Sequence, residues 1–177
     1  MNTSIALPAV LFLSNNVRKQ WVDVLLLYVE SHAIGATVYL SVSLPIRRKR
    51  PFTFNPDEFL YRKQGKKSTD SFFSGHVSVS ATSSFFMAKI FTDLHEIKGL
   101  ERMAYYGLAL IPPVTTGYFR FRAGRHFPSD LLTGLVVGAA VGILTPELHK
   151  NKNTKLTVTP VTGFGIIGLN AKLVLGK

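Results

Sequence analysis

Residues 120–148 read RFRAGRHFPSDLLTGLVVGAAVGILTPEL and join a basic loop to a long apolar segment. His126 and Asp130 are four residues apart, the spacing at which two side chains meet on one face of a helix. We therefore expect Asp130 to accept a hydrogen bond from one ring nitrogen of His126 while the other nitrogen faces outward. That arrangement prepares a histidine nucleophile. The pair could instead only stabilise a helix start, but three arginines within the seven residues 120–126 weaken that alternative.

Four apolar segments follow one another along the chain with basic or turn-rich breaks between them. They run roughly over Trp21–Ile46, His76–Leu94, Met103–Phe119 and Leu131–Leu148. Each is near the length of about 20 residues that spans a bilayer, yet none is an uninterrupted apolar run. The helices could cross a membrane only with their polar residues turned toward each other. The pattern predicts an all-α helical bundle of a polytopic membrane protein, with a soluble bundle as the alternative.

The chain is expected to divide into a helical domain over residues 1–150 and a tail over residues 151–177. A polar loop over residues 47–71 is inserted between the first two long helices. The tail alternates polar and apolar residues over Lys155–Pro160 and continues with glycine-spaced apolar residues, which predicts one or two short strands. The N-terminus lacks the pattern of a cleaved secretory signal, so targeting depends on internal helices or on a segment upstream of this sequence.

The chain is strongly basic, with 21 lysines and arginines against 10 acidic residues. This charge favours an anionic partner such as a phospholipid surface, a phosphorylated substrate or nucleic acid. Nucleic acid is disfavoured because the basic residues cluster with histidines instead of forming exposed stripes with aromatic platforms. The absence of cysteine excludes disulfides, thiolate zinc sites and cysteine nucleophiles.

A second basic cluster, RRKRP over residues 47–51, follows the first long apolar segment. Pro51 prevents helix continuation and favours an extended backbone at Arg50. A guanidinium held in this way can bind two phosphate oxygens at once. The loop could instead be a solvated surface segment or a cytoplasmic loop of the kind that carries positive charge.

A third cluster, over residues 71–76, ends in the tripeptide Ser74-Gly75-His76 at the border of the second apolar segment. Ser74 is a suitable N-cap residue, and Gly75 would let backbone amides approach an anion at the positive end of the helix. Simple helix capping is the alternative for this tripeptide.

Together the three clusters resemble the type 2 phosphatidic acid phosphatase superfamily, whose pattern is KxxxxxxRP, then PSGH, then SRxxxxxHxxxD. The matching residues are Arg50, Pro51, Ser74, Gly75, His76, Arg120, His126 and Asp130. The sequence departs from the pattern at three positions, where Ser43 replaces lysine, Phe73 replaces proline and Phe119 replaces serine. The missing lysine matters most, because Arg47, Arg48 or Lys49 would have to supply its phosphate contact.

The resemblance implies a site that holds a phosphoryl group between Arg50, Arg120 and the backbone amides around Ser74 and Gly75. Most of the catalytic work in phosphoryl transfer lies in such positioning and charge neutralisation. The resemblance implies neither a metal ion nor another cofactor, since the arginines supply the positive charge.

The resemblance further implies that His126, oriented by Asp130, attacks phosphorus and forms a phosphohistidine. His76 would protonate the leaving oxygen and then activate the water that releases phosphate. The two histidines must therefore start in opposite protonation states, His126 neutral and His76 charged, which their surroundings must produce.

A lipid phosphate or diphosphate is the expected substrate, because the motifs stand beside apolar segments that could accept an acyl or prenyl chain. The alternatives are a soluble non-specific acid phosphatase, a vanadate-dependent haloperoxidase-like enzyme, and a member impaired in catalysis by Ser43. The resemblance implies a bacterial inner-membrane location with the site facing the periplasm or the outside. The sequence predicts no oligomeric state.

Overall fold

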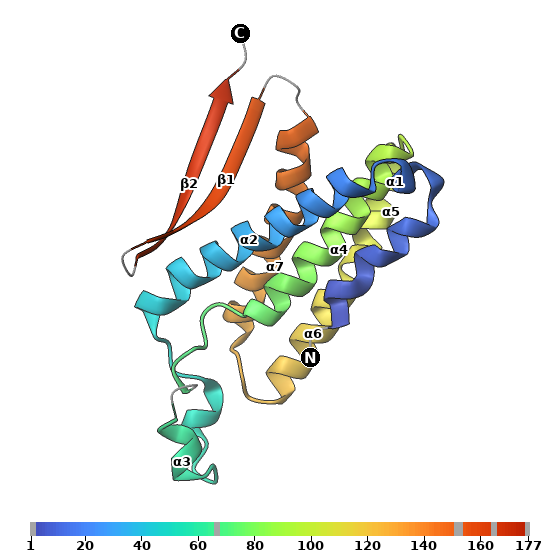
Figure 1. Ribbon diagram of the computed structural model, residues 1–177. Helices are drawn as coiled ribbons and strands as arrows, with labels where there is room; N and C mark the ends of the chain where they lie inside the picture. The colour runs from blue at the N-terminus through green and yellow to red at the C-terminus, as the bar shows by residue number, and fades with distance from the viewer. Residues whose placement is uncertain (1–2, 66–67, 151–153, 164–165, 176–177) are drawn as a thin grey trace.

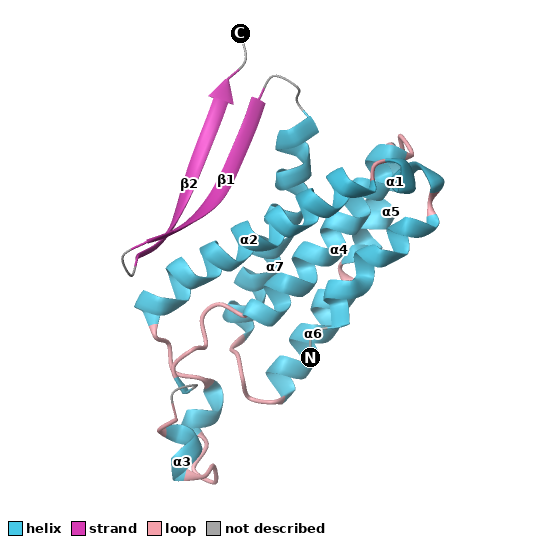
Figure 2. Cartoon of the chain, in the orientation of Figure 1, coloured by secondary structure: helices cyan, strands magenta, loops and turns pink. Residues whose placement is uncertain are grey.

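The computed structural model describes residues 3–65, 68–150, 154–163 and 166–175, and it describes side chains within residues 4–65 and 68–150. The long helices form one bundle, as Figures 1 and 2 show. In chain order the elements are η1 (Thr3–Leu13), α1 (Asn15–Lys19), α2 (Trp21–Ile46), η2 (Pro51–Phe54), α3 (Leu60–Lys63), α4 (Gly75–Leu94), α5 (Gly99–Ala109), α6 (Ile111–Arg122), α7 (Pro128–Lys150), β1 (Thr154–Gly163) and β2 (Ile166–Leu175). The predicted all-α bundle is confirmed, and the tail forms the antiparallel pair β1–β2, in which Thr154 lies opposite Leu175.

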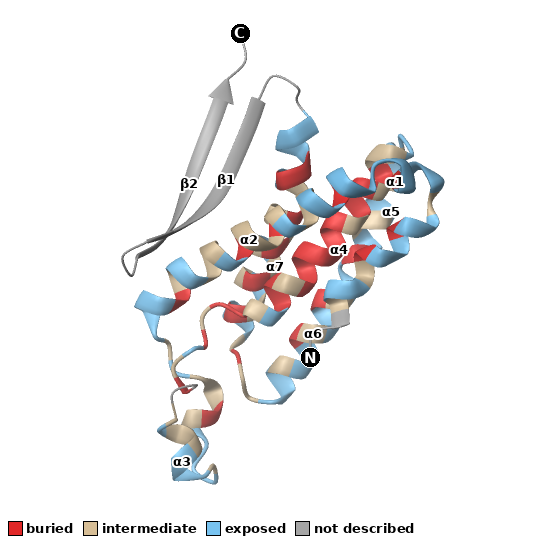
Figure 3. Ribbon diagram, viewed as in Figure 1, coloured by how far each residue is buried: buried red, intermediate tan, exposed pale blue. Residues whose placement is uncertain are grey.

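Helix α4 is the centre of the bundle and contacts α2, α5, α6, α7 and η1. Figure 3 shows it as the most continuously buried helix. Many of its buried side chains are small hydroxyls that bond to carbonyls of the preceding turn, as Ser83 does to Val79 and Ser84 to Ser80. These residues satisfy their own polar groups and allow neighbouring helices to come close.

Three glycines spaced four apart bring α7 directly onto the backbone of α4. A Cβ atom added at Gly134 or at Gly142 would lie 2.6 Å from the carbonyl oxygen of Ser74 or Thr82, respectively, and one added at Gly138 would meet the carbonyl oxygen of Ser78. The first turns of α4 and α7 therefore start side by side. Of the candidate histidines, His76 lies in the first turn of α4 and His126 lies in the loop that leads into α7.

The prediction of a single helix over Met103–Phe119 is wrong, because the segment forms two helices, α5 and α6, that meet at Leu110. Pro112 and Pro113 follow that junction directly. Neither proline has an amide proton to donate to a carbonyl in the preceding turn, which interrupts the helical hydrogen bonds.

Two segments are long and apolar enough to cross a membrane, judged by length and composition among the described residues. They are Trp21–Phe54, which includes α2, and Pro128–Lys150, which is α7. Large apolar side chains on both helices face outward, including Leu26, Leu132 and Val136. Exposed apolar surface of this kind marks an interaction with lipid or with another protein. The division of the chain at residue 150 stays a prediction.

Candidate active site

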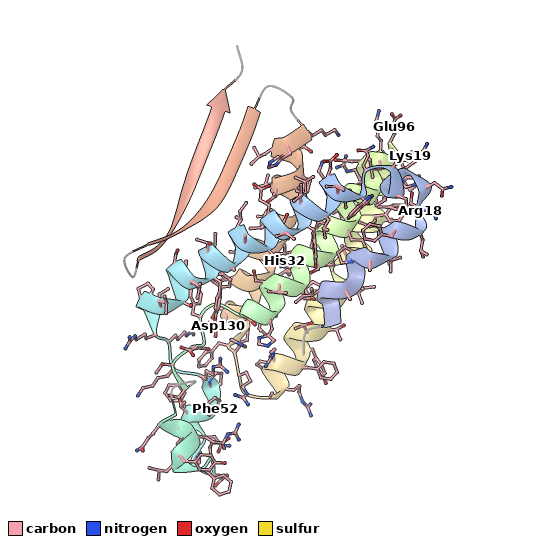
Figure 4. The ribbon with its side chains drawn as sticks, in the orientation of Figure 1. Arg18, Lys19, His32, Phe52, Glu96 and Asp130 are labelled. Carbon is pink, nitrogen blue, oxygen red and sulfur yellow. The ribbon has the colours of Figure 1, made fainter. Side chains whose placement is uncertain are left out.

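The three sequence clusters meet at one end of the bundle and are joined by backbone hydrogen bonds. The amide of Ser71 donates to the carbonyl of Arg48 at 3.0 Å, and the amide of Phe52 donates to the carbonyl of Gly124 at 3.0 Å. The amide of Ser74 donates to the carbonyl of Asp130, also at 3.0 Å. Figure 4 shows Phe52 and Asp130 at this end, with Arg18, Lys19 and Glu96 at the other.

His126 is buried in the loop before α7, where its side chain has a fixed tautomer. Its Nδ1 atom lies 2.7 Å from the main-chain carbonyl oxygen of Ser71. Because a carbonyl oxygen can only accept, Nδ1 carries the proton and Nε2 keeps its lone pair. Burial lowers the pKa of His126 to about 4, helped by the positive charges of Arg50 and Arg120 and opposed by the Ser71 carbonyl and by Asp130. The imidazole is therefore neutral at neutral pH.

The expected direct hydrogen bond between Asp130 and His126 is wrong. Asp130 is fully buried, and its Oδ2 atom accepts from the Ser71 hydroxyl at 2.5 Å and from the Phe127 amide at 2.9 Å. Its Oδ1 atom accepts from Arg48 at 2.6 Å. The four-residue spacing fails because α7 begins only at Pro128, so His126 is not part of the helix. Ser71 connects the two residues instead.

Of the three auxiliary cations predicted from the sequence, Arg48 has a different role. Its guanidinium binds Asp130, donates to the Ser129 hydroxyl at 2.9 Å, and lies 4.4 Å from the centroid of the Phe127 ring. Arg47 ends α2 in the left-handed conformation, at a φ of 41°, and both Arg47 and Lys49 are exposed. Arg48 thus holds the buried carboxylate, and its neighbours face outward.

Arg50 and Arg120 are both half-buried and act on both candidate histidines. Arg50 donates from Nε and Nη2 to the main-chain carbonyl of Asp70, at 3.3 and 3.1 Å. The positive charges of Arg50 and Arg120 contribute to lowering the pKa values of His76 and His126. The structure therefore brings these four predicted residues within electrostatic range of each other.

Ser74 occupies the N-cap position of α4, as predicted, but its side chain makes no capping hydrogen bond. Its hydroxyl is fully buried and has no hydrogen-bond partner within the part of the chain that the structure describes. Buried polar groups are nearly always paired, so this orphaned hydroxyl calls for a ligand or water. Gly75 has a second reason to be glycine, because a Cβ atom there would lie 3.1 Å from the Tyr39 ring.

His76 stands in the first turn of α4 and lines a cavity of about 330 Å³ between α2 and α4. Its side chain keeps contact with solvent, and partial burial, followed by the charges of Arg120 and Arg50, lowers its pKa. In the ligand-free site both imidazoles are shifted toward the neutral form, so the expectation that His76 starts charged while His126 is neutral stays a prediction.

Sequence reasoning missed two residues of this site, Ser71 and Arg125. Ser71 links Asp130 to His126, and nothing in its own motif marks that role. Arg125 directly precedes His126, and its positive charge acts on both Arg50 and Arg120. Its position next to the candidate nucleophile was the available signal. Among the described side chains, no group of three or more histidine, cysteine or acidic residues could hold a metal ion.

The family model of the PAP2 superfamily matches residues 24–154, which is well over half of the chain and includes every candidate site residue. No curated protein and no solved structure matches. The chain therefore belongs to the PAP2 superfamily, which covers phosphatases and haloperoxidases.

Proposed function

We propose that this chain is a phosphatase that hydrolyses a lipid phosphate or diphosphate through a phosphohistidine on His126. The observation that carries the proposal is the state of His126. Its Nδ1 proton is fixed on the Ser71 carbonyl, and its pKa is lowered to about 4, so Nε2 offers a lone pair beside Arg50 and Arg120.

The phosphoryl group is held by positive charge and by the Ser74 hydroxyl, which has no partner among the described residues. Arg50 and Arg120 neutralise its oxygens, and guanidiniums suit this because they bind phosphate through two parallel hydrogen bonds. The unpaired Ser74 hydroxyl donates to a further oxygen. The start of α4 adds the partial positive charge of a helix N-terminus.

In the first step, Nε2 of His126 attacks phosphorus as the bond from phosphorus to the leaving oxygen breaks. His76 gives its proton to that oxygen, which leaves as an alcohol or as a phosphorylated lipid. In the second step, neutral His76 takes a proton from water, and the resulting hydroxide displaces His126 from phosphorus. Inorganic phosphate leaves, and both histidines return to their starting states.

His76 needs a proton that the ligand-free site disfavours, and the substrate itself supplies the missing stabilisation. A bound phosphate dianion beside His76 raises the pKa of its imidazole, because an opposite charge favours the protonated form. His126 stays neutral because it is more deeply buried, which lowers its pKa to about 4 although the Ser71 carbonyl raises it. Substrate binding thus widens the difference between the pKa values of the two histidines.

A lipid substrate is supported by the cavity of about 330 Å³ that His76 lines. Its other walls are mainly apolar or small, including Ile5, Ala36 and Val79. A chain attached to the leaving oxygen can enter this space while the phosphate stays at the arginines. A small soluble phosphate ester has no apolar chain to fill this cavity. We place the protein in the bacterial inner membrane, with the site facing the outside, on the basis of the family's usual arrangement.

The direct test is a phosphate-release panel with the detergent-purified chain. It compares phosphatidate, prenyl diphosphate and small soluble esters, each with the native chain and with His126→Ala. We expect release from lipid phosphates that persists with a chelator and disappears in His126→Ala. Preference for small esters would favour the soluble acid phosphatase alternative, and halide oxidation with added vanadate would favour a haloperoxidase. Phosphate binding without release would identify an impaired member.

A further inference from the structure

Ser43 leaves the site without a cation at the position where the family pattern has lysine. It is nearly buried, at 9% exposure, and lies one helical turn after Tyr39 on α2. The Tyr39 ring contacts Gly75, so this face of α2 points toward the start of α4. A lysine at position 43 would extend along that face toward the phosphate site. The serine side chain brings no charge there.

The nearest basic residues after α2 do not fill this gap. Arg48 is committed to Asp130 and to the Phe127 ring. Arg47 and Lys49 are exposed. A third cation has to come from another part of the chain.

Arg125 approaches the site from the loop after α6, and its backbone is fixed on both sides. Its amide donates to the carbonyl of Arg120 at 3.0 Å, and the preceding Gly124 has a φ of 62° and accepts from the Phe52 amide. The Arg125 guanidinium lies 5.6 Å from the centroid of the Phe52 ring. Phe52 is two residues after Arg50, so this contact keeps Arg125 on the side of the site where Arg50 lies.

Three guanidiniums therefore gather at one place, those of Arg50, Arg120 and Arg125. Each of the other two interacts electrostatically with Arg125. Asp70 contributes an opposing charge near Arg50, but within residues 4–65 and 68–150 none of the three arginines forms a salt bridge. Like charges held close together without a salt bridge repel each other. A multiply charged anion bound between them removes that repulsion.

We propose that Arg125 is the third phosphate-binding cation of this site and replaces the charge that Ser43 does not supply. This inference rests on the proposed function, because it concerns the same phosphate group. It assigns a binding role to a residue at an unspecified position of the third motif, and it predicts that a lysine at position 43 can replace the charge of Arg125.

The test is a set of four full-length chains in detergent: native, Arg125→Gln, Ser43→Lys and the double variant. Dissociation constants are measured for inorganic phosphate and for orthovanadate, and kcat/KM is measured with the best substrate. Arg125→Gln should weaken anion binding by about 10- to 100-fold, the range for losing a hydrogen bond to a charged group. Ser43→Lys should change the native chain by less than about 3-fold, yet restore most of the affinity lost in Arg125→Gln.

Two further variants distinguish the effect of the lost charge on anion binding from an effect of the substitution on folding. Arg122→Gln removes an exposed arginine from the same turn and should leave anion binding unchanged. Arg125→Lys keeps the charge and should retain part of the affinity even where Arg125→Gln lowers the melting temperature.

The proposal is overturned if Arg125→Gln binds phosphate with the affinity of the native chain. It is also overturned if adding Ser43→Lys to Arg125→Gln fails to restore the lost affinity. It is also overturned if the native chain binds neither anion. These outcomes are separate from failure of the proposed function, which would appear as normal anion binding in the native chain with no phosphate release from any ester.

Discussion

Asp130 and His126 bind opposite ends of one residue. The hydroxyl of Ser71 donates to the Asp130 carboxylate at 2.5 Å, and the Ser71 carbonyl accepts from Nδ1 of His126 at 2.7 Å. The carboxylate therefore acts on the imidazole by fixing the loop that carries the acceptor. The orientation of the proposed nucleophile depends on a segment that lies before α4 as well as on α7.

The first prediction concerns this link. Ser71→Ala keeps the carbonyl but removes a donor from the buried carboxylate, so it should lower the free energy of unfolding by about 1–3 kcal/mol. We also expect kcat to fall more than KM rises, because the loop that orients His126 loosens. Denaturation and steady-state kinetics measure the two effects. Ser84→Ala, which removes only a bond within α4, is the matched control and should leave kcat unchanged.

A double-mutant cycle distinguishes a link from two independent effects. If Ser71 acts through Asp130, the loss of kcat in the double variant should be clearly smaller than the sum of the losses in Ser71→Ala and Asp130→Asn, expressed as free energies. Additive losses would mean that the two side chains influence His126 separately, and the link would be wrong.

The second prediction concerns Arg48, which binds the fully buried Asp130 while its own side chain is 37% exposed. Arg48→Ala leaves the carboxylate without its cation, which should destabilise the fold by about 1–3 kcal/mol after allowance for solvent screening. Arg47→Ala, at the neighbouring exposed position, should change stability by less than about 0.5 kcal/mol. Equal melting temperatures for the two variants would show that Arg48 does not hold Asp130.

The third prediction concerns pH. His126 must be neutral to attack, and its pKa is lowered to about 4, so activity should fall in acid only near that value. His76 must be protonated, and its pKa in the free enzyme is lowered from the usual 6.5, so kcat/KM should also fall as pH rises toward 6.5. The kcat/KM profile should therefore be bell-shaped with an acidic maximum.

In the substrate complex the alkaline limb should move upward, because bound phosphate raises the pKa of His76. The kcat profile reports that complex and should extend to higher pH than the kcat/KM profile. A maximum of kcat/KM on the alkaline side would contradict the assigned roles of the two histidines.

The fourth prediction concerns the glycine contact between α4 and α7. A Cβ atom at Gly138 would meet both the Ser78 carbonyl and Ala81, so Gly138→Ala should force the helices apart and destabilise the protein by about 1–3 kcal/mol or more. Activity should fall as well, since this contact sets where both helices begin. In α5, a Cβ atom at Gly107 would have open space, so Gly107→Ala should be neutral or slightly stabilising. Equal stability of the two variants would contradict the close packing.

The positions of the two candidate catalytic histidines, in the first turn of α4 and just before α7, were predictable from the sequence because they depend on local features. His76 follows an N-cap serine, and His126 follows a run of arginines directly before a long apolar helix. In a bundle of long helices, loop residues lie at one end or the other. Motifs that border several helices can therefore come together at the same end. The break between α5 and α6 also has a signal in the sequence, since Pro112 and Pro113 directly follow it.

The hydrogen-bond partners of the candidate catalytic residues were not predictable in the same way. Asp130 and Ser71 are 59 residues apart, and their contact depends on how the loop before α4 folds against α7. The four-residue spacing of His126 and Asp130 suggested a helical pair, yet the helix starts between them at Pro128. Likewise, the electrostatic interaction between Arg125 and Arg50 depends on the fold, because the two residues are far apart in the sequence.

The most direct test of the mechanism is to trap the phosphorylated enzyme. His76→Ala is mixed with 4-nitrophenyl phosphate, whose leaving group needs little protonation, so the first step can proceed while the second is slow. The reaction is quenched in alkali, where phosphohistidine is stable, and the modified peptide is identified by mass spectrometry. We predict phosphate on His126, with none in the double variant that also carries His126→Ala. Phosphate on another residue, or continued turnover in His126→Ala, would contradict the account.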